Sequence, residues 1–267
     1  MNFLHLSKKS LGQNFLTDQN IVKKIVNLIN IEKNQTVLEI GSGYGGLTKV
    51  IANTKSKKIY AVEKDKKLCD FLINNFKNNK NIKIINDDIF NIIERKNLGH
   101  NIVVFGNLPY NISTQILASL ILIKKWPPWY KILIFMFQKE VADRIIAKTN
   151  TKEFGRLSVL SNWRLEIKKH FNVSKNCFRP KPKINSTILS FIPKQNSFYL
   201  KNPKNLETVT RILFSNRRKI INKNFLKLFG GNKSIAKELS LNLYKRPGEL
   251  TNEMFYKIAM KYEKLNN

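Results

Sequence analysis

The sequence is poor in the residue types that build disulfide frameworks and metal sites. It contains two cysteines and three histidines among 267 residues. Cys69 and Cys177 stand in unrelated contexts, so we expect reduced thiols and a cytoplasmic protein rather than a cross-linked secreted one. The histidines and cysteines show no metal-ligand spacing, so we predict no metal site.

Long apolar runs are missing as well. The longest dense apolar patch, residues 116–123, is much shorter than the roughly 20 residues that a membrane-spanning helix needs. The first six residues lack the charge and apolar profile of a signal peptide. We therefore predict no membrane partner.

Acidic residues are scarce relative to basic ones. The chain has 18 Asp and Glu against 48 Lys and Arg, a formal net charge of +30. This excess indicates a polyanionic partner, and nucleic acid comes first. A compositional origin is the alternative, because the chain is rich in Lys, Asn and Ile, as proteins from AT-rich genomes tend to be. That origin explains Lys in place of Arg more easily than it explains the missing acids.

One strand-to-loop motif organises the rest of the chain. The apolar strand at residues 102–105 breaks at Gly106, at the strand end where open α/β sheets bind ligands. The loop could accept both N–H bonds of an amino group and stack a ring on a flat heterocycle. We interpret it as a clamp for the amine of a nucleobase, with an ordinary strand-ending turn as the alternative. The loop residues are Asn107, Leu108, Pro109 and Tyr110.

A second motif is typical of nucleotide-binding units. The apolar strand at residues 36–40 leads into a glycine-rich turn and then a helix from Leu47. Gly41 and Gly43 would let the backbone approach a ligand closely. The turn lacks the final Lys-Ser/Thr pair of a Walker A loop, which excludes that type of phosphate site.

Acids end the next two predicted strands. Glu63 lies 20 residues after Gly43, where an acid can accept hydrogen bonds from ribose hydroxyls. Asp88 could accept a hydrogen bond from the amino group of an adenine. The alternative is that these acids, with Asp65 and Asp87, cap the helices that follow them.

The alternation of strands and helices continues to about residue 192 and predicts an α/β fold with a mostly parallel, doubly wound sheet. From about residue 196 the pattern changes to helical segments at roughly 206–215, 219–229, 234–241 and 252–262. We predict a catalytic domain at residues 1–195 and a small all-helical domain at residues 196–267.

Two basic segments are candidates for contact with nucleic acid. Two prolines stiffen the first segment, whose Phe178 could present its ring to a base; a rigid linker with Phe178 in the core is the alternative. The second segment is a compact basic run in the helical region. The cations that would face phosphates are Arg179, Lys181, Lys183, Arg217, Arg218 and Lys219.

Together these segments resemble the ribosomal RNA adenine dimethyltransferase family over almost the whole chain. The resemblance implies a Rossmann-like class I methyltransferase sheet of seven strands, with one reversed edge strand and a helical C-terminal domain. It implies S-adenosylmethionine as the cofactor, bound by Gln13, Asn14, Leu16, Gly41, Gly43, Glu63, Asp88 and Asn107. The catalytic residues that it implies are Asn107, Leu108, Pro109, Tyr110 and Phe178.

Within that family, residues 214–219 and 246–251 resemble the small-subunit branch more than the antibiotic-resistance branch. The resemblance implies dimethylation of two adjacent adenosines in the 3′-terminal hairpin of 16S rRNA, within a small-subunit assembly intermediate, by a monomer. Three rival functions are a large-subunit methyltransferase of the resistance type, a non-catalytic assembly factor and a DNA adenine methyltransferase. Leu108, the Phe178 segment and the helical tail argue against the last.

Overall fold

The computed structural model describes residues 13–95, 98–195 and 198–266. The chain divides into two compact units. The first comprises Met1–Ser119, Pro127–Ala142 and Ile167–Pro193, and the second comprises Leu120–Trp126, Asp143–Glu166 and Lys194–Asn267. The last passage between the units, after Pro193, lies close to the domain boundary predicted after residue 195. Two earlier stretches, which the predicted domains place with the catalytic part, belong to the second unit.

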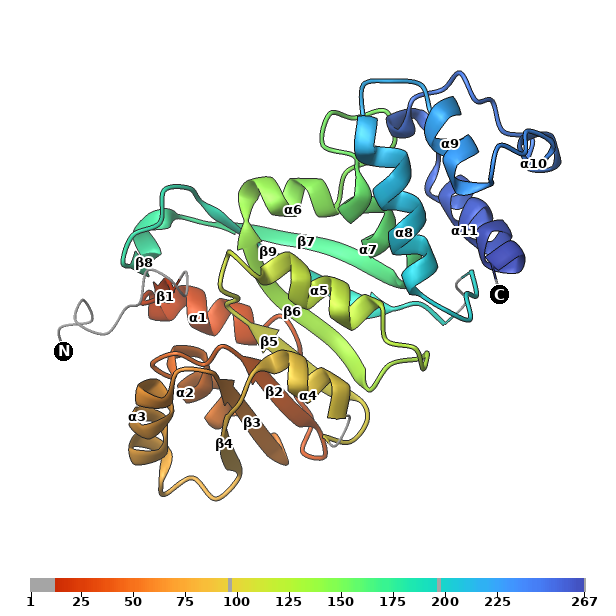
Figure 1. The fold of residues 1–267 in the computed structure, drawn as a ribbon. Coiled ribbons are helices and arrows are strands. Elements are labelled where there is room, and N and C mark those ends of the chain that lie inside the picture. Colours follow the sequence, from red (N-terminus) through yellow and green to blue (C-terminus); the bar gives the residue numbers. More distant parts are fainter. Residues whose placement is uncertain (1–12, 96–97, 196–197, 267) are drawn as a thin grey trace. The chain divides into compact units, whose positions relative to one another are not determined.

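The first unit is built on a seven-stranded sheet in the order β4-β3-β2-β5-β6-β9-β7, which can be followed in Figure 1. The first five of these strands pair in parallel. This confirms the predicted α/β class. The strands are β2 (Thr36–Ile40), β3 (Lys58–Glu63), β4 (Ile82–Asn86), β5 (Ile102–Gly106), β6 (Tyr130–Gln138), β7 (Leu165–Val173) and β9 (Ser186–Pro193).

The expected position of the reversed strand was wrong. β9 runs antiparallel to β6, with Leu133 opposite Phe191 and Gln138 opposite Ser186, but it lies between β6 and β7 and is therefore not an edge. The edge position belongs to β7, which comes earlier in the chain, and the returning β9 is inserted beside β6. Both sides of β9 are thus hydrogen-bonded, which protects its backbone from pairing with other chains.

A second, two-stranded sheet joins segments that are far apart in the sequence. β1 (Phe15–Leu16) pairs antiparallel with β8 (Phe178–Arg179), so that Leu16 lies opposite Phe178. The Thr17 N–H extends this pairing by donating to the Cys177 carbonyl at 2.9 Å. The sequence predicts no strand at either position, because two-residue strands leave no periodic pattern.

Two helices of the first unit begin at acidic caps. The Asp18 carboxylate accepts hydrogen bonds from the N–H groups of Asn20 and Ile21, and Asp65 accepts one from the Lys67 N–H. The helices are α1 (Gln19–Val26), α2 (Gly46–Ala52), α3 (Lys66–Phe76), α4 (Ile89–Arg95), α5 (Ser113–Ile121) and α6 (Lys139–Ile145). Among the described residues, no helix combines the length and the apolar character needed to cross a membrane.

The central strands of the sheet are buried on both faces. Val37, Val103 and Phe105 have no exposed surface, as expected for parallel strands that are covered on both sides. Glu39 is the acidic exception in β2, with 1% of its surface exposed. Burying a carboxyl group within a strand costs free energy unless a hydrogen bond or an opposite charge compensates it. Glu39 therefore needs a partner within the protein.

The second unit has a helical core of its own. Trp163 donates its indole N–H to the Phe198 carbonyl at 2.7 Å, and the Tyr256 hydroxyl donates to the Val159 carbonyl at 3.1 Å. These bonds explain why the stretch around Trp163 belongs to this unit. Its helices are α7 (Arg156–Arg164), α8 (Lys204–Leu213), α9 (Asn222–Leu228), α10 (Ser234–Glu238) and α11 (Asn252–Asn266), with short 3-10 turns at Lys175–Cys177 in the first unit and at Phe214–Asn216 and Pro247–Glu249 in the second.

Candidate active site

A cavity of about 220 Å³ lies at the carboxyl ends of the parallel strands. β2 stands between β3 and β5 in the sheet, so the chain order reverses at this point, where open α/β sheets bind their ligands. The cavity brings together segments that sequence reasoning singled out separately. Those of its lining residues that the sequence predicted are Gln13, Asn14, Gly41, Gly43, Glu63, Asp88, Asn107, Leu108 and Pro109. Of the predicted cofactor set, Leu16 alone does not line this cavity.

The glycine turn lines the cavity, and a side chain at Gly43 would require the Phe15 ring to move. Its backbone adopts φ of +54°, which residues with a Cβ rarely adopt. An added Cβ would lie 2.9 Å from the Phe15 ring. Gly41 has φ of +72°, and its N–H donates to the Val62 carbonyl at 2.9 Å. The Gly41 hydrogen bond thus ties the turn to β3, and the Phe15 ring packs against the turn at Gly43.

Glu63 faces the glycine turn. Its Oε2 accepts a hydrogen bond of 2.9 Å from the Gly43 N–H, and its Oε1 accepts one of 2.9 Å from the Asp65 N–H. Asp65, the adjacent acid, is the one that caps α3. Asp65 thus takes the capping role that the sequence left open, and Glu63 does not cap α3. A carboxylate has about four acceptor positions, so Glu63 retains capacity for hydroxyl donors.

Asp88 both caps a helix and lines the cavity. Its Oδ1 accepts a hydrogen bond of 3.0 Å from the Phe90 N–H, and its Oδ2 accepts one of 2.8 Å from the Lys64 ammonium. Burial acts to raise the pKa of Asp88, but the bonds from Lys64 and Phe90 outweigh it and lower the pKa. The carboxylate therefore stays ionised and can accept further hydrogen bonds.

Asn107 is held by its amide nitrogen. Nδ2 donates to the Asn14 carbonyl at 2.9 Å, which joins the N-terminal segment to the loop after β5. This bond uses the nitrogen and leaves Oδ1 as an acceptor. The approach of the glycine turn is close, because a Cβ on Gly41 would lie 3.8 Å from the Asn107 carbonyl oxygen.

The other loop residues take different positions. The Leu108 side chain is buried against Gly106, where an added Cβ would lie 2.6 Å from Leu108 Cδ2. Tyr110 is half-buried, and its hydroxyl shares a hydrogen bond of 2.6 Å with Ser186 Oγ. Burial raises the pKa of the Tyr110 phenol, although the Ser186 bond acts in the opposite direction. Tyr110 therefore stays neutral at ordinary pH.

Phe178 is not on the wall of this cavity. Its ring has no exposed surface and belongs to the core cluster that contains Leu16 and Val173. Side chains alternate along a strand, so the pairing that turns Phe178 inward leaves the neighbouring Arg179 exposed. The arrangement matches the alternative in which Phe178 is a core residue. The buried ring of Phe178 is therefore not presented to a base in this structure.

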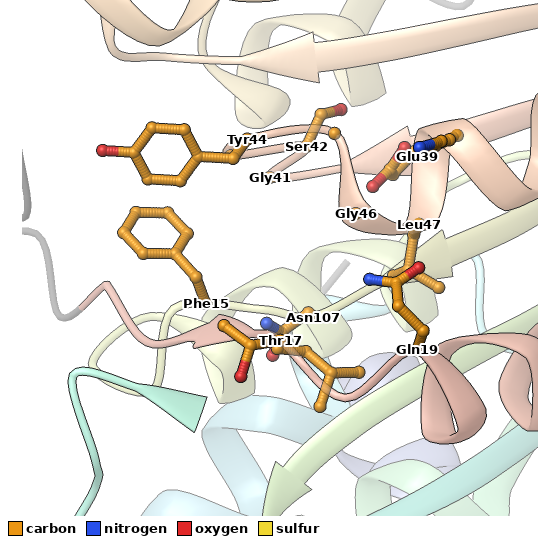
Figure 2. Close-up of a pocket in the computed structure, with 14 residues that line it drawn as sticks. Phe15, Thr17, Gln19, Glu39, Gly41, Ser42, Tyr44, Gly46, Leu47 and Asn107 are labelled. Carbon is orange, nitrogen blue, oxygen red and sulfur yellow. The ribbon is translucent and has the colours of Figure 1, made fainter. Parts of the chain in front are cut away.

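A second cavity, of about 320 Å³, shares Phe15, Gly41, Gly43 and Asn107 with the first. Figure 2 shows the Phe15 and Tyr44 rings facing each other on one side, with Gln19, Glu39 and Leu47 on the other. The two ring centroids are 4.6 Å apart with the planes at 69°. Leu16, which the sequence assigned to the cofactor, lines this cavity.

Glu39 is a residue of this second cavity to which the sequence assigned no role. The Thr48 hydroxyl donates to Glu39 Oε2 at 2.5 Å. Burial raises the pKa of Glu39 to about 8, and the charge of Glu63 adds to that rise, while the Thr48 bond acts against it. The signal was present in the sequence, because an acid in an otherwise apolar strand is rarely a packing residue.

The predicted RNA-binding cations lie in both units, and all six are exposed. Arg179, Lys181 and Lys183 are exposed in the first unit, and Arg218 and Lys219 in the second. Arg217 is also exposed, but its Nη2 donates to the Lys152 carbonyl. That bond gives Arg217 a structural role within its own unit.

Lys219 borders a groove of about 880 Å³ that the sequence did not predict. No ion pair engages its four exposed cations within the described part of the chain, so their charge is available to an anion. These cations project from α8, α9 and the turn between them: Arg211, Lys219, Lys223 and Lys227.

The sequence is similar to those of curated ribosomal RNA methyltransferases. The chain is 48% identical over 259 residues to ribosomal RNA small subunit methyltransferase A of Pelagibacter ubique, covering 97% of this chain and 98% of that protein. It is 38% identical over 267 residues to the protein of that name from Wolbachia pipientis wMel, covering 98% of this chain and 91% of that protein.

Solved structures agree with the sequence relatives. A dimethyladenosine transferase from Plasmodium falciparum superposes with a TM-score of 0.76 at 26% identity, covering 94% of this chain and 98% of that one. The 23S rRNA methyltransferase ErmE shares the fold, with a TM-score of 0.64 at 19% identity, covering 94% of this chain and 99% of that one.

The model of the ribosomal RNA adenine dimethylase family matches residues 4–264. The chain therefore belongs to this family of S-adenosylmethionine-dependent methyltransferases.

Proposed function

We propose that the chain transfers two methyl groups to each of two adjacent adenosines in the 3′-terminal hairpin of 16S rRNA. We propose that it acts as a monomer, in the cytoplasm, on a small-subunit assembly intermediate. The observation that carries the proposal is the position of Asn107 at the carboxyl end of β5, between two cavities, with its amide nitrogen bonded to Asn14 and its amide oxygen left as an acceptor.

The residues around the first cavity fit S-adenosylmethionine. Gly41 and Gly43 line the cavity without a side chain, so their backbone can approach a ligand closely. Glu63 would accept hydrogen bonds from the ribose hydroxyls. Asp88 would accept one from the amino group of the cofactor's adenine. Gln13 and Asn14, together with Leu16 from the second cavity, would close the amino-acid end. When bound, the cofactor supplies an electrophilic methyl group on its sulfonium.

The loop after β5 would prepare the nucleophile. The lone pair of an adenine amine is delocalised into the ring, so the amine is a weak nucleophile. Asn107 Oδ1 and the Leu108 carbonyl would accept its two N–H bonds, which favours a pyramidal nitrogen and directs the lone pair away from them. Placement and preorganised acceptors of this kind contribute roughly several kcal/mol. The proton can leave after transfer, so no dedicated base is required.

The second methylation makes a different demand on the same acceptors. After the first transfer the amine retains one N–H and carries a methyl group, so one acceptor loses its partner. Asn107 has a side-chain acceptor, which can turn about its own torsions, whereas the Leu108 carbonyl belongs to the backbone. We propose that Asn107 adjusts to the bulkier amine while Leu108 and Pro109 hold the backbone.

In the proposed mechanism the target adenine stacks on the ring of Tyr110. Its ring is half-buried beside the loop, and base–aromatic stacking contributes about 1–3 kcal/mol per base. Phe178 lies in the core. We therefore assign Phe178 to holding the segment that carries Arg179, Lys181 and Lys183, rather than to contact with the base.

Cations in both units would hold the RNA backbone. Neutralising phosphates with Lys and Arg releases counter-ions, which is the main source of affinity for nucleic acid. In the second unit we extend the predicted set from Arg217, Arg218 and Lys219 to the whole basic groove. Its additional members are Arg211, Lys223 and Lys227.

The experiment that tests the proposal is methyl transfer from labelled S-adenosylmethionine to 30S and 50S particles from a strain without adenine dimethylation, followed by mapping of the label. Dimethyladenosine at the paired 3′-hairpin sites of the small subunit is the expected result. Label in the large subunit alone would move the chain to the resistance branch. Absence of label on both, with cofactor binding intact, would favour a non-catalytic assembly factor.

A further inference from the structure

Ser186 lies where the chain returns to the sheet after the proline-rich segment. It is the first residue of β9, opposite Gln138 at the end of β6, and it has no exposed surface. Its neighbour Asn185 is tied on both sides: the Asn185 carbonyl accepts a hydrogen bond of 2.9 Å from the Lys139 N–H, and Asn185 Oδ1 accepts one of 3.0 Å from the Lys175 N–H. The backbone at Ser186 is therefore held in place by the sheet pairing and by the hydrogen bonds of Asn185.

The Ser186 hydroxyl forms a hydrogen bond with the Tyr110 hydroxyl. Ser186 Oγ and the Tyr110 hydroxyl are 2.6 Å apart, a short and well-formed hydrogen bond between residues 76 positions apart in the sequence. The phenol oxygen lies on the axis about which the ring turns, so this bond sets where the ring tip lies and leaves the ring plane to the surrounding packing. The direction of the Tyr110 side chain is thus decided by β9.

The base of the same loop has its own attachments. The Ser113 hydroxyl donates to the Tyr110 carbonyl at 3.3 Å, and the Ile112 N–H donates to the Pro109 carbonyl at 3.1 Å. These bonds hold the backbone on which the ring stands, but they do not reach the ring tip. Among the described residues, Ser186 is the hydrogen-bond partner of the Tyr110 hydroxyl.

We propose that Ser186 is a positioning residue for methyl transfer, whose hydroxyl holds the Tyr110 ring where the target adenine stacks. This inference rests on the proposed function, in which Tyr110 supports the adenine while Asn107 and Leu108 accept its amine. A ring that is free to swing leaves the amine poorly aimed, and small displacements of reacting groups cost much of the rate. Ser186 thereby acts on the transfer step through Tyr110 and not on cofactor binding.

The test is a double-mutant cycle measured by single-turnover methylation of small subunits. Ser186→Ala should lower the rate about tenfold and leave the affinity for S-adenosylmethionine unchanged. Tyr110→Phe, which keeps the ring and removes the same bond from its other end, should cause a similar loss. Adding Ser186→Ala to Tyr110→Phe should then lower the rate by less than about twofold further. Equal losses from Ser186→Ala in both backgrounds, or no loss in either, would overturn the proposal.

Ser190→Ala is the matched control. Ser190 is also a buried serine of β9, and its hydroxyl lies 2.8 Å from His170 Nε2 on the neighbouring strand, away from the site. The change removes the same group from the same strand, so it reports the cost to the sheet alone. We expect wild-type methylation rates from Ser190→Ala; a loss as large as that of Ser186→Ala would assign both effects to the sheet.

A binding measurement separates this inference from the proposed function. The same four proteins are titrated with a short RNA hairpin that carries 2-aminopurine at the target position, whose fluorescence falls when the base stacks on a ring. Ser186→Ala should weaken the quenching only while Tyr110 is present. If wild-type protein transfers no methyl group, the proposed reaction fails, and the quenching cycle still decides whether Ser186 positions Tyr110.

Discussion

Thr48 donates its hydroxyl hydrogen bond to Glu39, an acid that lies in a strand of otherwise apolar residues. Glu39 has almost no exposed surface, and burial raises its pKa to about 8. At neutral pH the folded protein therefore holds Glu39 mostly as the neutral acid. The pair joins β2 to α2 immediately below the glycine turn, so the turn is supported by a residue that titrates near physiological pH.

The first prediction concerns stability against pH. The folded pKa of Glu39 lies above its ordinary value of 4.5, so between these two values the folded state holds a proton that the unfolded state has lost. The free energy of unfolding should fall as pH rises from about 4.5 to about 8, and the Glu39 contribution should be constant above that. Glu39→Gln keeps an acceptor for Thr48 and should remove this part of the dependence, which amounts to roughly a few kcal/mol. Urea unfolding of both proteins at pH 5 and pH 8 measures the difference, and identical pH dependences would contradict the prediction.

A second prediction concerns the catalytic asparagine. Asn107→Ala removes the proposed acceptor for the adenine amine and the bond to Asn14. Single-turnover methylation should fall by roughly two to three orders of magnitude, as when a preorganised hydrogen-bond partner of a reacting group is removed. Cofactor affinity, measured by calorimetry, should change little. A parallel loss of cofactor affinity would show instead that Asn107 serves the cofactor. Asn75→Ala on the exposed face of α3 is the control for loss of an asparagine.

A third prediction separates backbone strain from crowding at the glycine turn. Gly43→Ala forces a residue with a Cβ into a left-handed backbone and places that Cβ against Phe15. Gly230 has nearly the same φ, +56° against +54°, but an added Cβ there meets nothing within 4 Å. Gly230→Ala should therefore cost only the strain, about 1–2 kcal/mol, and Gly43→Ala should cost more. Thermal unfolding measures both.

The glycine comparison also has a functional side. Gly43→Ala should weaken S-adenosylmethionine binding strongly, because the added Cβ displaces the Phe15 ring that lines the cavity. Gly230→Ala should leave the affinity for S-adenosylmethionine unchanged. Phe15→Ala in the Gly43→Ala background relieves the crowding and should recover part of the stability. If both glycine variants lose equal stability, contact with Phe15 contributes nothing and strain alone explains the turn.

A fourth prediction addresses RNA affinity. Reversing charge at Lys223 and Lys227 should weaken binding to small-subunit RNA and reduce the slope of log K against log salt, by about 0.7–0.9 for each phosphate that is no longer neutralised. The control is Lys264→Glu, which makes the same kind of change at an exposed position on α11, outside the groove. If Lys264→Glu lowers the slope as much per charge, the groove has no specific role and the net charge of +30 acts as a whole.

Local patterns determined most of the sheet and much of the site. Apolar runs bounded by glycine or acids identified β2, β3 and β5, because a strand buried on both faces needs a continuous apolar run. The spacing between Gly43 and Glu63 placed both residues at the carboxyl ends of neighbouring strands, and the structure joins them there by a hydrogen bond. The family resemblance rested on these same short segments, and the comparisons confirmed it.

Only the tertiary structure decided which partners meet. Phe178 was available to a base or to the core, and the antiparallel register with Leu16 turned it inward. Ser186 carried no signal, because its partner Tyr110 lies 76 residues earlier and the contact depends on where β9 enters the sheet. Periodicity and spacing describe one segment at a time, whereas strand order, register and burial are properties of the whole chain, since every segment competes for the same apolar interior.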